Sequence, residues 1–125
     1  MFGFQKLDVY RCATQFLAAA APLSGAIPRG YSPLADQLRR AALSVPLNIA
    51  EASGRSAGDA RRSYAIARGS TLECAAILDA LETLGFTGVE QLAKPRELLD
   101  RMVAMLTVLV RASPSASASA SASAG

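Results

Sequence analysis

The sequence predicts an all-α protein, an antiparallel up-down four-helix bundle, on three observations. Apolar residues make up 51% of the chain and aromatic residues only 6%. Alanine dominates the apolar fraction, and small side chains favour closely packed helices over strands. Apolar residues also recur at helical spacing in four long segments. Short connections separate these segments, and helices joined in this way pack as antiparallel neighbours.

The length of 125 residues suits one domain. We expect this domain to span residues 1–112. Its helices are expected at about 5–21, 33–53, 57–84 and 88–111. Residues 113–125, SPSASASASASAG, are low in complexity. Serine and alanine bury too little apolar surface to order a chain, so we expect a disordered tail there.

The first helix has clearly separated faces. Its apolar face holds Val9, Tyr10, Ala13, Phe16, Leu17 and Ala20, and its polar face holds Asp8, Arg11 and Gln15. Segment 16–26 is as apolar as a signal-peptide core. Because Asp8 and Arg11 precede it within one helical pattern, we interpret it as part of a retained helix. Segment 22–33 holds three prolines and two glycines, which predicts a loop.

The second helix is expected to begin with Ser32 as its N-cap and Pro33 at its first helical position. It runs to about Ser53, and Gly54 is expected to end it in the left-handed conformation. This helix also contains Pro46, which cannot donate to the carbonyl of Ala42. Asn48 or a water can satisfy that carbonyl, so we interpret Pro46 as a tolerated kink.

The third and fourth helices each open on a capping-box pattern, SAGD at 56–59 and TGVE at 87–90. The third ends at Leu84 with Gly85 as its stop. Its apolar face is expected to hold Ile66, Ser70, Ile77, Leu81 and Leu84, opposite Arg61, Arg68 and Asp79. The apolar face of the fourth holds Leu98, Leu99, Met102, Leu106, Leu109 and Val110. Pro95 predicts a kink or a restart there.

A line of polar residues runs along the second helix. At 100° per residue it lies between about −60° and +20° from Gln37. It consists of Gln37, Arg40, Ser44, Asn48, Glu51 and Arg55. The expected core face lies on one side, and it holds Leu34, Leu38, Ala41, Val45 and Ile49. Leu43 and Leu47 lie on the other side, at about 240° and 280°.

Leu43 and Leu47 allow two interpretations. They are single exposed leucines, which are common, or a neighbouring subunit covers them and the polar line follows the seam. We favour the second, because a helix of a monomeric bundle should be polar over its whole outer half. Leu43 and Leu47 are therefore the candidate oligomer-interface residues.

Glu73 lies beside the apolar residues Ile66 and Ile77 of the third helix rather than on its polar face. A buried carboxylate needs a cation or several donors, so we expect an ion pair with Arg40 or Arg39. The expected structural polar network consists of Arg40, Ser44, Asn48, Glu51 and Glu73.

Catalytic chemistry has little support. The chain has no histidine, Cys12 and Cys74 lack metal-ligand spacing, and no glycine-rich phosphate loop is present. Nothing orients carboxylates such as Glu51 and Glu73 for acid–base work. We expect no enzyme activity, cofactor or metal. Both cysteines are expected to be reduced core thiols, which favours the cytoplasm. No apolar run reaches the roughly 20 residues that cross a membrane.

The arginines are the better functional candidates. Residues 29–68 hold seven arginines and three acidic residues, or +4, and the rest of the chain carries −1 of the net +3. Arg55, Arg61 and Arg62 surround the turn before the third helix, beside its positive N-terminal end. Arg39 and Arg68 extend this patch. We expect it to bind RNA or DNA phosphates independently of sequence. No aromatic residues lie among these arginines, which argues against base stacking. The alternative is a solvated charged face.

Three segments resemble the signature segments of the four-helix-bundle proteins encoded in 23S rRNA intervening sequences. They are FQKLDVYRCA (4–13), QLRRAALSVPLNIAEASGR (37–55) and YAIARGSTLEC (64–74), and the resemblance spans about residues 4–111. Those proteins are similar to the accessory variability proteins of diversity-generating retroelements. The resemblance implies a cytoplasmic bacterial bundle that forms a homopentameric ring. In the retroelement branch it implies a basic ring that binds nucleic acid and a reverse transcriptase.

Residues and resemblance together lead to one functional hypothesis. We expect a non-enzymatic homo-oligomer whose arginine-rich surface binds nucleic acid or a nucleoprotein partner. The alternative is a protein–protein scaffold that binds no nucleic acid.

Overall fold

The computed structural model describes residues 2–113, apart from the side chain of Lys6. Within that range it contains four α-helices and no strand, which confirms the all-α prediction. The helices are α1 (Asp8–Gly25), α2 (Ser32–Ser53), α3 (Ala57–Thr83) and α4 (Val89–Ala112); the 3-10 helices η1 (Gly3–Lys6) and η2 (Arg29–Tyr31) precede α1 and α2. Residues 114–125 of the expected tail lie outside the described residues.

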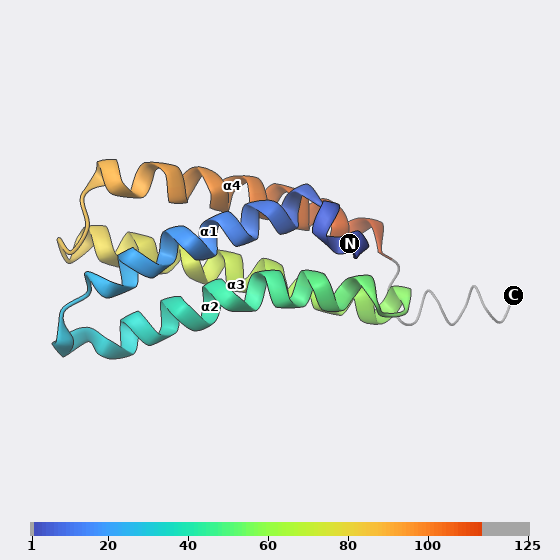
Figure 1. The fold of residues 1–125 in the computed structure, drawn as a ribbon, viewed down its shortest axis with the longest axis horizontal. Helices are drawn as coiled ribbons and strands as arrows, with labels where there is room; N and C mark the ends of the chain where they lie inside the picture. Colours follow the sequence, from blue (N-terminus) through green and yellow to red (C-terminus); the bar gives the residue numbers. More distant parts are fainter. Residues whose placement is uncertain (1, 114–125) are drawn as a thin grey trace, which may run out of the picture.

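Figure 1 shows the four helices side by side along one long axis. The α1–α2 and α3–α4 connections lie at one end and the α2–α3 connection at the other, so the chain reverses at each connection. Close contacts join α1 to α2, α2 to α3, α3 to α4 and α4 to α1; among the described residues none joins the diagonal pairs. We call the end with η1 and the α2–α3 connection the proximal end, and the other the distal end.

The core runs along the centre of the bundle. Its fully buried large side chains include Phe16, Leu38, Ile49, Leu78, Leu81, Leu92, Leu98, Met102 and Leu106. Ala13, Ala42 and Ala67 are also completely buried. Because these methyl groups replace larger side chains between helices, they allow the close packing that the alanine-rich composition predicts. Cys12 and Cys74 are buried in this core as free thiols.

Helix α1 begins and ends later than predicted. Leu7 is extended and precedes the first turn, and the helix runs through Pro22 to Gly25. The loop predicted at 22–33 therefore starts too early. Leu23 and Ser24 are both buried in this last turn, and the Ser24 hydroxyl donates to the Ala21 carbonyl at 2.8 Å. The free energy gained by burying Leu23 offsets the loss of the helix hydrogen bond that Pro22 cannot donate.

Helix α2 passes through a buried Pro46 without a break. The sequence predicted that Asn48 or a water satisfies the Ala42 carbonyl. The Asn48 amide instead donates to the Ser44 carbonyl at 2.9 Å and to the Ser44 hydroxyl at 3.1 Å. Asn48 contacts Ser44 because it lies one turn later in α2, on the same face of the helix. The helix also starts one residue early, with Tyr31 in the N-cap position in place of Ser32.

The two glycines that end helices behave differently. Gly54 has a φ of −101°, so the predicted left-handed conformation is wrong. Gly85 has a φ of 75° and ends α3 as expected. The amide of Gly85 donates to the Glu82 carbonyl at 3.0 Å, and the amide of Phe86 donates to the Leu81 carbonyl at 2.9 Å. These two bonds form a Schellman motif, which requires the left-handed residue.

Neither predicted capping box forms as expected, although Ser56 does precede α3 as its N-cap residue. The Ser56 hydroxyl bonds the Asp59 carboxylate at 3.2 Å, and it does not cap the backbone of α3. In α4 the cap is Gly88, whose amide donates to Gln91 Oε1 at 3.1 Å. Thr87, the predicted cap, is buried instead, and its hydroxyl has no partner among the described residues. Helix α4 then runs through Pro95 without the restart that the proline allowed.

The buried face of α3 is rotated from the predicted one. Ile77 and Leu81 are buried as expected, but Ile66 and Leu84 are 45% and 43% exposed. The core line instead follows Ser63, Ala67, Thr71, Cys74, Leu78 and Leu81. Helix α3 packs against both α2 and α4. Small and weakly polar residues suit this two-sided contact, and they give little apolar signal in the sequence.

Candidate nucleic-acid interface

The predicted arginine patch divides between the two ends of the bundle. Arg39 lies in the distal half of α2, whereas Arg55 follows its last turn. The 16 residues between them correspond to about 24 Å along a helix. Arg39 also pairs with Asp36 on its own helix at 3.2 Å. Arg39 is therefore not part of one surface with Arg55, Arg61 and Arg62.

Arg55 and Arg62 line a pocket of about 230 Å³ beside the α2–α3 connection. Its lining consists of Asn48, Glu51, Arg55, Asp59, Arg62, Ser63 and Ile66. Arg55 forms an ion pair with Glu51, one turn earlier. Within the described residues, no carboxylate lies within ion-pair distance of Arg61 or Arg62. These two exposed cations are therefore available to an outside anion.

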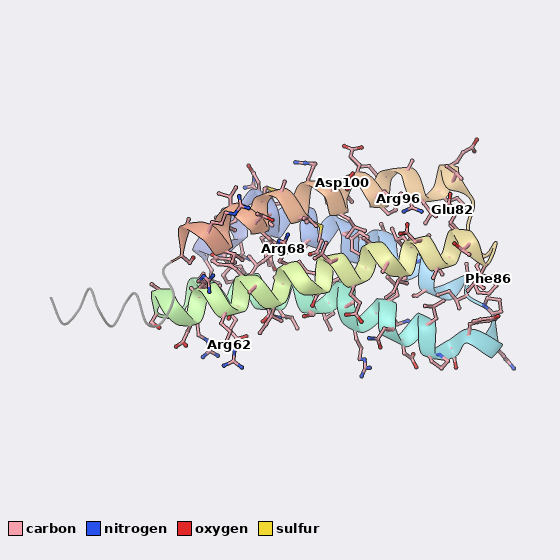
Figure 2. The ribbon with its side chains drawn as sticks, turned by 180° about the vertical axis from the view of Figure 1, so that it is seen from behind. Arg62, Arg68, Glu82, Phe86, Arg96 and Asp100 are labelled. Carbon is pink, nitrogen blue, oxygen red and sulfur yellow. The ribbon has the colours of Figure 1, made fainter. Side chains whose placement is uncertain are left out.

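Arg68 has a different environment from Arg62, although both belong to α3. Figure 2 shows the two side chains on opposite sides of this helix. Arg68 is half-buried, and its Nε donates to Thr107 Oγ1 of α4 at 2.7 Å. The Thr107 hydroxyl in turn donates to the Val103 carbonyl at 2.8 Å. Arg68 thus joins α3 to α4, and it is separated from the α2–α3 turn.

The predicted polar network is present only in part, as two separate groups of hydrogen bonds between α2 and α3. Gln37 donates to the Glu73 carboxylate, and Arg40 donates to the Gln37 amide oxygen at 3.2 Å. Neither Arg39 nor Arg40 pairs directly with Glu73 among the described residues. The predicted Arg–Glu pair is therefore wrong. Glu73 is only partly buried, so an amide donor and water suffice for it.

Further along the same seam, the Ser70 hydroxyl of α3 donates to the Ser44 hydroxyl of α2 at 2.8 Å. Ser44 also accepts from Asn48. Glu51 takes no part in these bonds and pairs with Arg55 at the proximal end. Gln37 was predicted in the polar line and Ser70 on the apolar face of α3, and neither was predicted to connect the two helices.

Charge is distributed unequally along the bundle. The proximal half of the bundle comprises η1, the α2–α3 connection and the half of each helix nearest to them. The proximal half then holds eight basic and three acidic residues, a net charge of +5. The distal half holds five basic and seven acidic residues, a net charge of −2. The proximal basic residues are Lys6, Arg11, Arg55, Arg61, Arg62, Arg68, Arg101 and Arg111.

This asymmetry is hidden in the linear sequence, because the basic segment 29–68 includes distal arginines and excludes Arg101 and Arg111. At the distal end, Arg96 of α4 pairs with Asp79 at 2.6 Å and with Glu82 at 3.0 Å, both in α3. Figure 2 shows Arg96 and Glu82 turned toward each other. Three of the five distal basic residues, Arg39, Lys94 and Arg96, pair with carboxylates. At the proximal end basic residues exceed acidic ones.

Large apolar side chains are exposed on both α2 and α3. Leu43 and Leu47 are 46% and 57% exposed, as the helical angles predicted. Ile66, which was predicted in the core, is 45% exposed and adds to the apolar outer surface of α3. Leu43 also borders a hollow of about 270 Å³ between α1 and α2. The described chain alone leaves these side chains in water.

The described residues contain no group of three or more histidine, cysteine or acidic side chains placed to hold a metal ion. None of the described helices combines the length and apolar character needed to cross a membrane. Burial, with Glu73 nearby, raises the pKa of the Cys74 thiol to about 12, so this cysteine is protonated and inert at neutral pH. Nucleophilic chemistry therefore has no support at Cys74.

Four packed helices with a polar α2–α3 seam and one basic end define a small all-α bundle protein. The family model described as 23S rRNA-intervening sequence protein matches residues 5–108. The chain belongs to this family. No curated protein matches it.

Proposed function

We propose that this protein is a non-enzymatic, oligomeric bundle that binds RNA or DNA phosphates through its proximal end. The observation that carries the proposal is the net charge of +5 in the proximal half against −2 in the distal half. A polyanion approaching such a molecule is oriented by the field, so it meets the proximal end first.

Arg61 and Arg62 supply the first contacts of this proposed interface. Both are exposed, and neither has an ion-pair partner among the described residues. They lie in the first turns of α3, whose N-terminal end adds partial positive charge. Arg55 keeps further donors after pairing with Glu51. Contacts of this kind hold phosphates without reading the base sequence.

The oligomer is proposed from the exposed apolar side chains Leu43, Leu47 and Ile66. Covering exposed leucines with a second copy releases water and stabilises the assembly by about 25 cal/mol for each Å² of apolar area. The family resemblance suggests a homopentameric ring. Cyclic symmetry repeats the same end of every subunit on one rim. The proximal charges of all copies would then act together on one nucleic acid.

The remaining parts of the proposal concern location and partners. The protein is proposed to act in the cytoplasm as a binding protein without catalysis of its own. Similarity to the retroelement accessory proteins suggests a reverse transcriptase as partner, if the gene lies beside such an enzyme. A 23S rRNA intervening sequence around the gene would instead place the protein among those encoded in such sequences, outside the retroelement branch.

Salt-dependent binding tests the proposal. The triple variant Arg55→Gln, Arg61→Gln, Arg62→Gln removes proximal contacts, and Arg29→Gln, Arg39→Gln, Lys94→Gln removes the same charge at the distal end. Dissociation constants for RNA and DNA are measured from about 50 to about 300 mM salt. We expect the slope of log Kd against log salt to fall by about two for the proximal variant, and to change little for the distal one.

Two outcomes would contradict this proposal. Equal slopes for both triple variants would mean that only overall charge matters. No salt-sensitive binding by the wild-type chain at low salt would favour the protein–protein scaffold, which Leu43 and Leu47 would serve without any nucleic acid.

A further inference from the structure

Three aromatic rings form a cluster at the proximal end, and the outer two are stacked. The rings of Phe2 and Phe4 lie 5.8 Å apart and nearly parallel, with an interplanar angle of 8°. Phe4 in turn meets Tyr10 of α1 edge to face, with ring centroids 5.1 Å apart. Phe2 is the outermost ring and is 73% exposed, the most exposed of the large apolar side chains in the described residues.

The backbone that carries this exposed ring is held by hydrogen bonds and packing. The Phe2 amide donates to Gln5 Oε1 at 2.7 Å, and the Gln5 amide donates to the Phe2 carbonyl at 3.2 Å. The segment that carries them, η1, packs against both α1 and α2. The main chain of Phe2 is therefore restrained, and its ring contacts Phe4 on one side while most of its surface faces water. An accessible aromatic face of this kind is suited to stacking with another flat ring.

The stack lies at the basic end of the molecule. Figure 1 shows the N-terminus at the same end as the α2–α3 connection. Arg55 lies in this connection, and Arg61 and Arg62 lie in the first turns of α3. An accessible aromatic ring at the same end of a bundle as a surplus of arginine suits single-stranded nucleic acid, because bases stack on the ring while cations hold the phosphates. The segments that supply ring and arginines are about 50 residues apart in sequence, and so the fold alone reveals the combination.

We propose that Phe2 stacks on an unpaired base of single-stranded RNA or DNA whose phosphates contact the proximal arginines. This inference rests on the proposed nucleic-acid function and adds its strand preference. Bases in a duplex are already stacked and paired, so a duplex cannot offer a free base face to Phe2. Single strands consequently bind more tightly than duplexes of the same length, and the difference depends on Phe2.

The test compares Phe2→Ala with Phe2→Trp, which keeps an aromatic face, and with Phe2→Leu, which keeps apolar volume without one. Each variant is titrated with fluorescein-labelled single strands of about 12 nucleotides, oligouridylate and oligothymidylate, and with a mixed-sequence duplex of equal length. We expect Phe2→Ala and Phe2→Leu to weaken single-strand binding about fivefold to about 100-fold. Phe2→Trp should restore it, and duplex binding should stay unchanged in all three.

A second readout reports stacking directly. A single strand containing 2-aminopurine should lose fluorescence on binding the wild type and keep it with Phe2→Ala. Unchanged single-strand affinity in Phe2→Ala, with a normal response to the proximal arginine variant, would overturn this inference and leave the proposed function standing. Equal losses with single strands and duplex, or a changed oligomer mass in Phe2→Ala, would assign Phe2 to structure or to a protein contact instead.

Discussion

Gln37 of α2 donates a hydrogen bond to the carboxylate of Glu73 in α3, and Arg40 contacts Gln37 rather than Glu73. An amide, and not a cation, therefore links the two helices at this point. Because Glu73 is only partly buried, its charge needs no buried counter-ion. The seam between α2 and α3 is thus a polar contact of moderate strength.

This arrangement predicts unequal effects of two substitutions on the free energy of unfolding. Gln37→Leu should cost about 1–3 kcal/mol, because Glu73 loses a donor in a partly dry site. Arg40→Met should change stability by less than about 0.5 kcal/mol, since Arg40 is exposed. Urea unfolding followed by circular dichroism measures both. A cost for Arg40→Met equal to that for Gln37→Leu would mean that Arg40 holds Glu73 directly.

The two helix-ending glycines provide a matched pair. Gly85→Ala should destabilise the protein by about 1–2 kcal/mol, because its φ of 75° places a Cβ in the left-handed region. Gly54→Ala should be nearly neutral, since its φ is −101° and the nearest atom to an added Cβ is 3.9 Å away. Thermal unfolding compares the two. A larger loss for Gly54→Ala would contradict the assigned conformations.

The buried thiol of Cys74 predicts a fall in stability at alkaline pH. Burial raises its pKa from 9.0 to about 12 in the folded protein, so between these values the unfolded chain releases a proton that the folded chain keeps. Stability is complete below pH 9 and is lost at about 1 kcal/mol per pH unit above it. Burial also raises the pKa of Tyr64 and adds to the same trend.

Urea unfolding at several pH values between about 8 and 11 measures this slope. Cys74→Ala should reduce the slope and leave the smaller contribution of Tyr64. An identical slope in Cys74→Ala would show that other groups cause the alkaline loss. Iodoacetamide should also modify Cys74 only after unfolding, because the folded thiol is buried and protonated.

The exposed leucines of α2 predict a change in assembly. Leu43→Lys with Leu47→Lys should reduce the mass in solution to that of one chain, 13.0 kDa, with helix content retained. The control is Val89→Lys with Val108→Lys, because these valines are 66% and 64% exposed on α4. Light scattering measures the mass. A wild-type chain that is itself monomeric would remove the subunit contact from this account.

The sequence predicted the all-α class, the four helices and most of the residues that face the core. Helical spacing placed Leu43 and Leu47 outside the core, and capping and stop residues located the helices to within a few positions. Errors arose where tertiary contacts override local signals. Burial of Leu23 extends α1 past Pro22. In α3, Ala67 and Thr71 are buried in place of Ile66, because this helix packs against both α2 and α4.

The candidate interface was harder to predict, because it depends on which segments share one end of the bundle. The local cluster Arg55, Arg61 and Arg62 was visible in the sequence. That Arg39 belongs to the other end, and that Phe2 belongs to this one, follows only from the directions of the helices. The same is true of Arg96, whose acidic partners lie 14 and 17 residues away in α3.

Arginine footprinting tests the central claim that nucleic acid contacts one end of the bundle. The protein is treated with phenylglyoxal, which modifies exposed arginines, with and without bound single-stranded RNA, and each site is quantified by mass spectrometry. We predict protection of Arg55, Arg61, Arg62 and Arg111, with unchanged modification of Arg29 and Arg39. Equal protection at both ends, or protection confined to Arg29 and Arg39, would contradict the claim.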